Sequence, residues 1–289
     1  MEYYTTVFEI YSDDIDKTHD LTKELPYFNI KLELPKFRIS GSHYSCDVNN
    51  KTIYKNIQSI KYLNETIAEQ LYAMRDTQFN SFIDFLKVNP CNSAQTEILI
   101  KLDFFSEFGK SDKLICIYSL FTDMYTKKDG QIVPKKMINK EKTVYPHDIL
   151  RKYSKETDTR FNVYDMDGFC TEIISTFEDK DLPITERLEA QTDYLSYIEY
   201  VNPAAKTYGY ILSIDIKYAP KFQIYKLDTG ETITVKYGKR EYEMSGLKEK
   251  QVIRFVTYDK PKRKLVDGHW VESDETEPWI KAYKIPNIS

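Results

Sequence analysis

The opening of the chain alternates between a helical pattern and short strand patterns. Apolar residues at helical spacing predict a helix over 14–25, which Pro26 ends. Apolar and charged residues alternate over 30–34, as in a half-buried strand, and two further β-like pieces flank 48–51. Residues 1–58 are therefore predicted to form a small α+β segment.

Helical spacing dominates the next stretch, residues 59–125. Asn64 is of a type that caps helix N-termini, and phenylalanines recur at helical spacing from Phe79 until an Asn-Pro pair at 89–90. Four short helices with tight connections are predicted, over approximately 64–75, 79–88, 93–102 and 111–125.

Turn signals and charged residues outnumber periodic apolar positions over 126–150, which favours a loop-rich connection. Residues 156–199 are strongly acidic, with 12 acidic and 3 basic side chains. We therefore interpret 126–200 as a loop-rich connection followed by an acidic linker.

Strand patterns and turn signals fill the last part of the chain, residues 201–289. A turn signal, Asp-Thr-Gly at 228–230, separates two of the runs, and glycines punctuate the others. The predicted strands are 208–216, 221–227, 232–236, 252–257 and 270–283. Five strands over about 80 residues fit an OB-type barrel, a fold that commonly binds single-stranded nucleic acid or oligosaccharide. The predicted fold class is α+β throughout.

Composition places the protein among soluble globular chains: 41% of its 289 residues are hydrophobic, 30% are charged, and the formal charge is -4. The start lacks the basic and apolar regions of a secretory signal, so the cytosol is the expected compartment. The four cysteines are scattered, without the spacing of a zinc site or a disulfide framework.

Charge is distributed unevenly along the chain. The acidic stretch 156–199 is followed by residues 201–264, with 14 basic and 7 acidic side chains, and the sign changes near a proline-containing joint at 202–205. A basic domain in a mildly acidic protein indicates a polyanion as partner, with an ordinary solvated surface as the alternative.

Motifs of common hydrolases and nucleotide triphosphatases are absent from the sequence, and no cofactor is expected on this chain. The nearest pair of catalytic carboxylates is Asp165 and Asp167, which on a strand would share one face and could hold Mg²⁺. The strongly acidic surroundings lack the basic clamp that phosphate chemistry needs, so no metal site is assigned. A metal-dependent nuclease is a remote hypothesis.

Basic and aromatic side chains interleave on the predicted strands of the barrel. Stacking on aromatic rings together with neutralisation of phosphates suits single-stranded nucleic acid, although small barrels also alternate such positions for packing and solubility. The candidate DNA-binding residues are Lys217, Tyr218, Lys221, Phe222, Lys236, Lys239, Arg240, Lys262, Arg263 and Lys264.

Five short runs of residues, in this order along the chain, resemble the C-terminal region of bacterial family C replicative DNA polymerases, the DNA polymerase III α subunits. LPKFRIS at 34–40 is similar to the end of the fingers, and IQSIKYLNE at 57–65 to the entry into a first hairpin. FNSFIDF at 79–85 and EILIKLDFFSEFG at 97–109 resemble the rest of a tandem helix-hairpin-helix. EAQTDYLSYI at 189–198 is similar to the linker before the family's OB domain.

The resemblance implies that hairpin backbone amides and helix N-termini hold DNA phosphates, a use that exposed N–H donors support on physical grounds. This sequence departs from the family at Tyr62 to Asn64, where a glycine-containing turn is usual, and at Asp103, which replaces a usual glycine. The implied hairpin contacts are Lys61, Asn64, Lys101, Gly109, Lys110, Ser111 and Lys113.

The chain has no room for the family's catalytic palm, so the resemblance implies a DNA-binding portion of such a polymerase without polymerase activity of its own. Duplex and single-stranded DNA would be its partners. The palm would belong either to a separate catalytic chain or to a longer polymerase from which this portion was cut. The family's clamp-binding peptide has a loose counterpart at 191–195, which would add a sliding clamp. The alternative is a scaffold or interaction protein whose barrel binds a protein partner.

Overall fold

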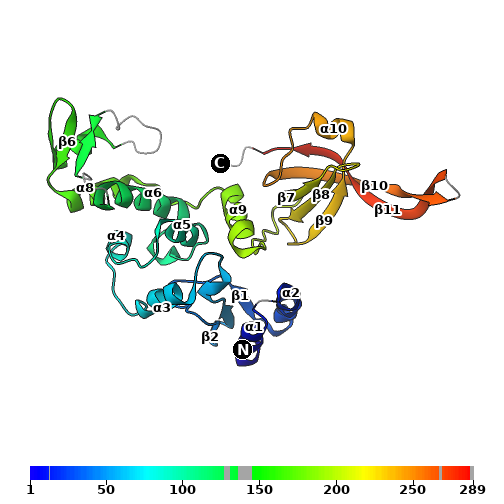
Figure 1. Ribbon diagram of the computed structural model, residues 1–289, viewed down its shortest axis with the longest axis horizontal. Helices are drawn as coiled ribbons and strands as arrows, with labels where there is room; N and C mark the ends of the chain where they lie inside the picture. Colours follow the sequence, from blue (N-terminus) through cyan, green and yellow to red (C-terminus); the bar gives the residue numbers. More distant parts are fainter. Residues whose placement is uncertain (13, 127–130, 136–144, 267–268, 287–289) are drawn as a thin grey trace. The chain divides into compact units, whose positions relative to one another are not determined.

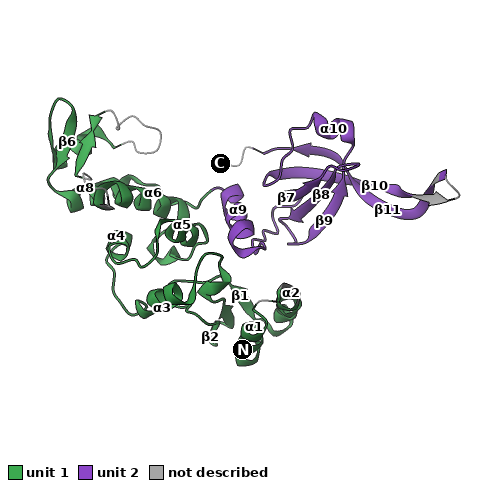
Figure 2. Cartoon of the chain, viewed as in Figure 1, with its two compact units in different colours: residues 1–182 green, residues 183–289 purple. Residues whose placement is uncertain are grey.

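The computed structural model describes residues 1–12, 14–126, 131–135, 145–266 and 269–286. The chain divides into two compact units, unit 1 from Met1 to Leu182 and unit 2 from Pro183 to Ser289 (Figure 2). No helix among the described residues is both long and apolar enough to cross a membrane.

The N-terminal part of unit 1 packs short helices against a small sheet. Its elements are α1 (Glu2–Ile10), α2 (Ile15–Glu24), η1 (Leu25–Phe28), β1 (Lys31–Glu33), β2 (Ser45–Asp47) and β3 (Thr52–Tyr54), with the strands in the order β1-β3-β2 (Figure 1). The predicted helix and strands are confirmed, whereas α1 was not predicted. Phe8 and Ile53 are fully buried in the shared core.

The predicted four-helix region follows. Its elements are η2 (Ile57–Ser59), α3 (Glu65–Ala73), α4 (Phe82–Leu86), α5 (Ser93–Lys101), η3 (Ser106–Phe108), α6 (Ser111–Phe121) and the π-helical turn η4 (Thr122–Thr126). Asn64, Ser81 and Asn92 cap the first three α-helices through their side chains, as expected for these residue types.

A group of phenylalanine rings forms the core of this region. The Phe37 ring lies 5.1 Å from the Phe85 ring and 6.0 Å from the Phe104 ring, between centroids, and the Phe85 and Phe105 rings are 4.8 Å apart. The Phe37 N–H also donates to the Phe104 carbonyl. The segment before the helices is thus packed against α4 and against the turn that follows α5.

The stretch 126–200 contains more regular structure than its pattern of turns and charges indicates. Its described elements are β4 (Ile132–Pro134), α7 (His147–Tyr153), β5 (Ser154–Glu156), β6 (Arg160–Val163), α8 (Met166–Thr176) and α9 (Ile184–Leu195), with strand order β4-β6-β5. Strands of three or four residues are too short to show an alternating pattern, which explains why they were missed. The four-part division of the chain stays a prediction.

Unit 2 begins with α9, which packs on the barrel that follows. Leu188 of α9 is fully buried in a cluster with Tyr210, Leu227 and Val252. Lys250 Nζ lies 3.0 Å from Glu189 Oε1 and 2.7 Å from Asp193 Oδ2, and hydrogen bonds to these carboxylates raise the pKa of Lys250. The helix is therefore part of the barrel unit.

A closed five-stranded barrel makes up the rest of unit 2. Its elements are β7 (Tyr208–Asp215), β8 (Lys221–Lys226), β9 (Thr232–Lys236), α10 (Lys239–Glu243), β10 (Val252–Val266) and β11 (His269–Lys284). The strand order is β10-β11-β9-β8-β7, closed by pairing of β10 with β7, and β9 runs parallel to β11. The predicted α+β class and OB-type barrel are confirmed.

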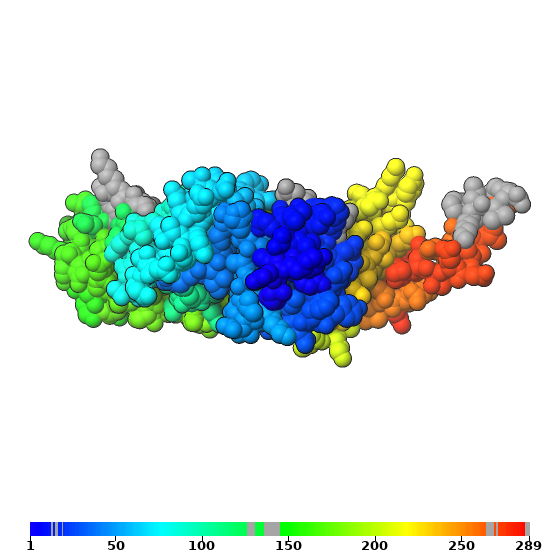
Figure 3. Space-filling view, turned by 90° about the horizontal axis from the view of Figure 1, so that it is seen from below, coloured from blue at the N-terminus to red at the C-terminus, as the bar shows by residue number. Residues whose placement is uncertain are grey.

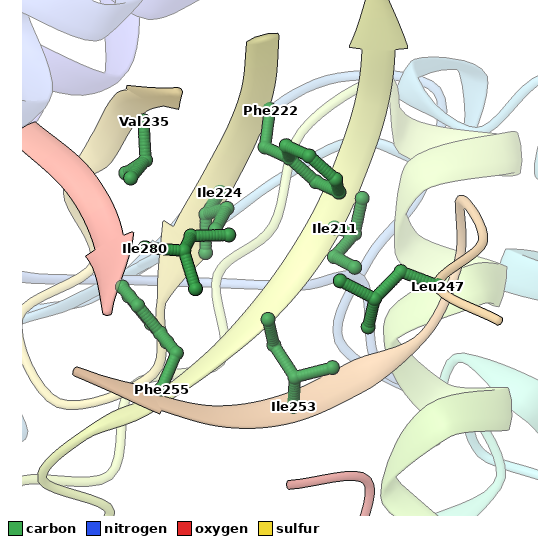
Figure 4. Packing of buried hydrophobic residues seen from close by; sticks show 8 residues of the cluster. All are labelled: Ile211, Phe222, Ile224, Val235, Leu247, Ile253, Phe255 and Ile280. Carbon is green, nitrogen blue, oxygen red and sulfur yellow. The ribbon is translucent and has the colours of Figure 1, made fainter. Parts of the chain in front are cut away.

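Residues that face the barrel core alternate with residues that face outward along the strands. Ile211, Ile224, Val235 and Ile253 are fully buried and point toward one another (Figure 4). Strands β10 and β11 continue as a two-stranded arm that projects beyond the body of the barrel (Figures 1 and 3). The arm pairs Lys260 with Glu277, well past the last core residues.

Candidate nucleic-acid interface

The first hairpin retains the backbone conformation of a glycine turn without a glycine. Tyr62 has φ 71°, in the left-handed region, and its side chain is 74% exposed. Gln95 Nε2 donates to the Tyr62 carbonyl at 2.9 Å, which ties this turn to α5. Lys61 and Asn64 flank it on the surface, and Asn64 caps α3 by accepting from the Ile67 N–H. The turn therefore presents a cation beside a helix N-terminus, as the resemblance implies.

Replacing Tyr62 with glycine is expected to raise the free energy of unfolding of unit 1 by about 0.5–1 kcal/mol. The left-handed conformation costs an ordinary residue about 1–2 kcal/mol, and the greater entropy loss of glycine offsets part of this gain. Denaturant unfolding of the full chain gives the value. Lys61→Gly is the matched control, since Lys61 has no positive φ, and it should destabilise the unit. Destabilisation by both variants would contradict the prediction.

The second departure from the family shows the same conformation. Asp103 has φ 58°, and its carbonyl accepts from Lys36 Nζ at 3.1 Å. Lys101 is half-buried in the last turn of α5, where a cation interacts favourably with the helix dipole. This placement gives Lys101 a structural role besides its implied contact with DNA.

The loop at the start of α6 is occupied by the chain itself, which corrects the predicted phosphate contact there. The Lys110 N–H donates to Asp179 Oδ1 at 3.0 Å, and Lys110 Nζ lies 2.8 Å from Asp181 Oδ2. Ser111 is buried, and its hydroxyl accepts from the Leu182 N–H. A carboxylate thus takes the position expected for a phosphate. The neighbouring Gly109 has φ 141°, a conformation that residues with side chains rarely adopt.

Lys113, the last of the predicted contacts in this region, is half-buried in the first turn of α6, beside this covered helix start. Lys180, in the covering segment, lies 3.2 Å from Glu178 and 3.8 Å from Asp112, and these contacts raise its pKa. Sequence separation explains why the covering segment was not predicted: Asp179 lies 69 residues after Lys110.

Removing both carboxylates, in Asp179→Ala with Asp181→Ala, is expected to have two opposite effects. The stability of unit 1 should fall by about 1 kcal/mol because the start of α6 loses its acceptor. Affinity for duplex DNA should rise because the Lys110 N–H loses its acceptor and two carboxylates that would repel a phosphate are gone. Denaturant unfolding and fluorescence anisotropy measure these effects.

The control removes two exposed carboxylates elsewhere in the same unit, in Asp76→Ala with Asp158→Ala. It has the same net charge and leaves α6 capped. An equal rise in duplex affinity in both double variants would show that only net charge matters, and would contradict the covered-site explanation.

In unit 2, cations and an aromatic ring gather at the β7–β8 connection. Tyr218 is 73% exposed, and Lys217 Nζ lies 5.7 Å from its ring centroid. Lys221, at the start of β8, is exposed and stands directly opposite Lys236 of β9. Lys236 is the less available of the two, since its Nζ lies 2.6 Å from Glu277 Oε2. Lys217, Tyr218 and Lys221 thus form one exposed surface, which we call the β7–β8 surface.

Phe222 requires a correction. The side chain was predicted to stack on DNA bases, but it is fully buried in the barrel core (Figure 4), where its ring packs at 5.7 Å from the Tyr242 ring and 6.3 Å from the Tyr237 ring. It therefore has no exposed face to offer a base.

The basic run on the arm is largely matched by acidic residues on the opposite strand. Lys262 Nζ lies 2.9 Å from Glu275 Oε2, and this contact raises the pKa of Lys262. Arg263 stands opposite Glu272 in the β10–β11 register. The count of charges over 201–264 did not include these acidic partners on β11. The arm is therefore less basic than predicted. The side chain of Lys264 lies outside the described residues.

Lys239 and Arg240 are exposed on the short helix α10, between β9 and β10. They follow Gly238, which lines a hollow of about 420 Å³ together with the arm residues Tyr258, Lys260 and Trp279. The charge of Lys260 was noted from the sequence, but Tyr258 and Trp279 were missed. For Tyr258, the every-second-residue pattern from Arg254 to Lys260 marks a shared strand face.

The hypothesis of a metal site at Asp165 and Asp167 is not supported by the geometry. Asp165 caps α8 by accepting from the Gly168 N–H, whereas Asp167 accepts from the Tyr125 hydroxyl at 2.6 Å, which lowers the pKa of Asp167. The two lie at a helix start, not on a strand, and no metal-ligand cluster of acidic, His or Cys residues is found in the described part of the chain.

The loose clamp-binding peptide lies within α9. Gln191 is buried, and its side-chain oxygen accepts from the Glu199 N–H at 2.9 Å, while Leu195 is also buried. Asp193 is held by Lys250. An extended peptide bound by another protein needs these side chains free, so the folded helix does not present them.

The chain was compared with protein families. Residues 31–114 match the helix-hairpin-helix motif family. The matched range includes both turns with a left-handed residue, Tyr62 and Asp103. Comparison with curated proteins gives no match. The helix-hairpin-helix motif points to nucleic-acid binding, and the barrel is OB-like.

Proposed function

We propose that this protein is the DNA-binding portion of a replicative polymerase similar to bacterial DNA polymerase III α subunits. In this proposal the helix-hairpin-helix region binds the backbone of the primed duplex, and the barrel holds the single-stranded template. The catalytic palm of such a polymerase is not part of these 289 residues.

One observation carries the proposal: a helix-hairpin-helix region and an OB-like barrel occur in one chain, in the order of the polymerase family. The first fits the uniform phosphate backbone of a duplex, since a turn and a helix start offer N–H donors irrespective of sequence. The second supplies exposed cations beside an aromatic ring, which suits a single strand.

Within unit 1, the first hairpin is the better candidate for the duplex contact. Lys61 and Asn64 are exposed there, whereas the start of α6 is covered by Asp179 and Asp181. Within unit 2, the β7–β8 surface is the better candidate for the single strand, because Tyr218 is widely exposed and Lys221 has no ion-pair partner among the described residues. A sliding-clamp contact is not part of the proposal, since residues 191–195 are folded into α9.

Fluorescence anisotropy of the full chain with three labelled DNAs tests the proposal. The DNAs are a single strand, a blunt duplex of the same sequence and a primed template that joins both forms. The primed template is expected to bind tightest, since both units then contribute. Equal affinity for the single strand and the primed template would remove the hairpins from the proposal, and no binding to any of them at low salt would overturn it.

A further inference from the structure

Two cations stand directly opposite each other on the outer surface of the barrel. Arg254 of β10 pairs in register with Lys284 of β11 and, on its other side, with Tyr208 of β7. Like charges directly opposite on neighbouring strands are destabilising. In the part of the chain that is described, no carboxylate forms an ion pair with either cation, and Arg254 Nε donates only to the neutral Thr207 hydroxyl at 3.2 Å.

This pair borders a hollow of about 390 Å³. Tyr208, Arg254 and Lys284 line it, together with Ile285 and Pro286. Both cations are exposed. A hollow with two uncompensated cations and a phenol ring is complementary to an anionic group, and a phosphate oxygen would relieve the repulsion between the cations.

The same outer face continues along β10 and β11 toward the arm. Phe255 and Ile280 point into the core, so the residues beside them in the pleat face outward. The next outward pair is Val256 with Ala282, both exposed, and after a register shift the following pair is Tyr258 with Trp279.

A third cation of this face, Lys260, lies beside the aromatic pair. Lys260 Nζ lies 4.1 Å from the Trp279 ring centroid and 5.3 Å from the Tyr258 ring centroid. Tyr258 is 39% exposed, and the second hollow of about 420 Å³ opens beside these rings. The order along the face is therefore cation pair, small apolar pair, aromatic pair, cation.

This order matches a single strand of DNA better than a folded protein or a duplex. Arg254 and Tyr258 are four positions apart along β10, about 13 Å at the usual rise per residue. Phosphates of a strand would meet Arg254 and Lys284 while a base stacks on Trp279, a combination typical of sequence-tolerant single-strand sites. A duplex would keep its bases stacked on each other and away from the rings.

We propose that the outer face of β10 and β11, from Arg254 and Lys284 to Tyr258 and Trp279, is a second single-strand site separate from the β7–β8 surface. This inference rests on the proposed function. Together the two sites would lengthen the segment of template that the barrel holds.

Trp279 provides a direct reporter, because the chain has only two tryptophans. In the Trp270→Phe background, a short oligothymidylate is titrated while Trp279 fluorescence and the anisotropy of the labelled DNA are followed together. Stacking is expected to quench Trp279 with the same midpoint as the anisotropy. Inorganic polyphosphate, which has charge without bases, should compete but leave Trp279 unquenched.

Arg254→Glu with Lys284→Glu, in the same background, is expected to weaken oligothymidylate binding about tenfold or more. Lys248→Glu, an exposed lysine outside both hollows, is the control and should change the affinity less than twofold. Circular dichroism checks that each variant is folded.

The outcomes separate this inference from the proposed function. Tight oligothymidylate binding that neither quenches Trp279 nor weakens in the double variant overturns the second site and leaves the proposed function standing. Quenching by polyphosphate equal to that by DNA overturns the stacking of a base. Absence of single-strand binding in the parent protein overturns the proposed function and the second site with it.

Discussion

Truncation of Phe222 to alanine is expected to lower the free energy of unfolding of unit 2 by about 3–5 kcal/mol, the range seen when a buried phenylalanine is removed from a core. The ring is fully buried and packs against Tyr237 and Tyr242, so its loss leaves a cavity that surrounding strands cannot readily fill. Both tryptophans lie in unit 2, so their fluorescence follows the unfolding of this unit in denaturant.

Tyr218→Ala is the matched control, since it removes an aromatic ring four residues earlier that is 73% exposed. Its effect on unfolding should stay within about 0.5 kcal/mol. If Phe222→Ala were as mild as this control while single-strand affinity fell sharply, the ring would be a stacking surface and would not belong to the barrel core.

The combined replacement Lys217→Glu, Tyr218→Ala and Lys221→Glu is expected to weaken single-strand binding roughly a hundredfold. Stacking on one ring contributes about 1–3 kcal/mol, and the loss of two phosphate contacts adds a further salt-dependent reduction. Anisotropy with an oligothymidylate at fixed salt measures the change.

A control for charge alone combines Lys206→Glu and Lys248→Glu, two exposed lysines of the same unit that lie outside the β7–β8 surface. It should weaken binding only severalfold through the overall field. A similar loss in both sets of variants would mean that the barrel attracts DNA through net charge, without a defined surface between β7 and β8.

The barrel was predictable because its strands are long enough to show their pattern and glycines separate them. The alternation of apolar and polar residues along β8 also places Phe222 in the barrel core. Phe222 and Ile224 share one face of the strand, while Lys221 and Gln223 share the other. Residue type alone favours stacking for a phenylalanine, whereas its phase in the alternation places the ring in the core.

Other features depend on partners that are distant in the sequence. Asp179 reaches the start of α6 from 69 residues away, and nothing local to Gly109 signals it. Glu272 and Glu275 lie opposite the basic residues of β10, so the charge of the arm depends on strand pairing. The uncompensated pair of Arg254 and Lys284 likewise becomes visible only in the register of β10 and β11.

The left-handed turns at Tyr62 and Asp103 show that tertiary structure can override residue preference. The carbonyls of both residues accept a hydrogen bond from a side chain of another segment, Gln95 for Tyr62 and Lys36 for Asp103. These contacts help hold a conformation that glycine adopts more readily. The absence of glycine from these positions therefore does not remove the hairpins.

The most direct test of the central claim, that the barrel binds single-stranded DNA through cations on its surface, is the salt dependence of oligothymidylate affinity in the full chain. Each phosphate contact on a single strand contributes about -0.7 to the slope of log affinity against log salt. Four contacts, at Lys217, Lys221, Arg254 and Lys284, predict a slope of about -3. Binding that is absent at low salt, or that stays unchanged as salt rises, would contradict the account.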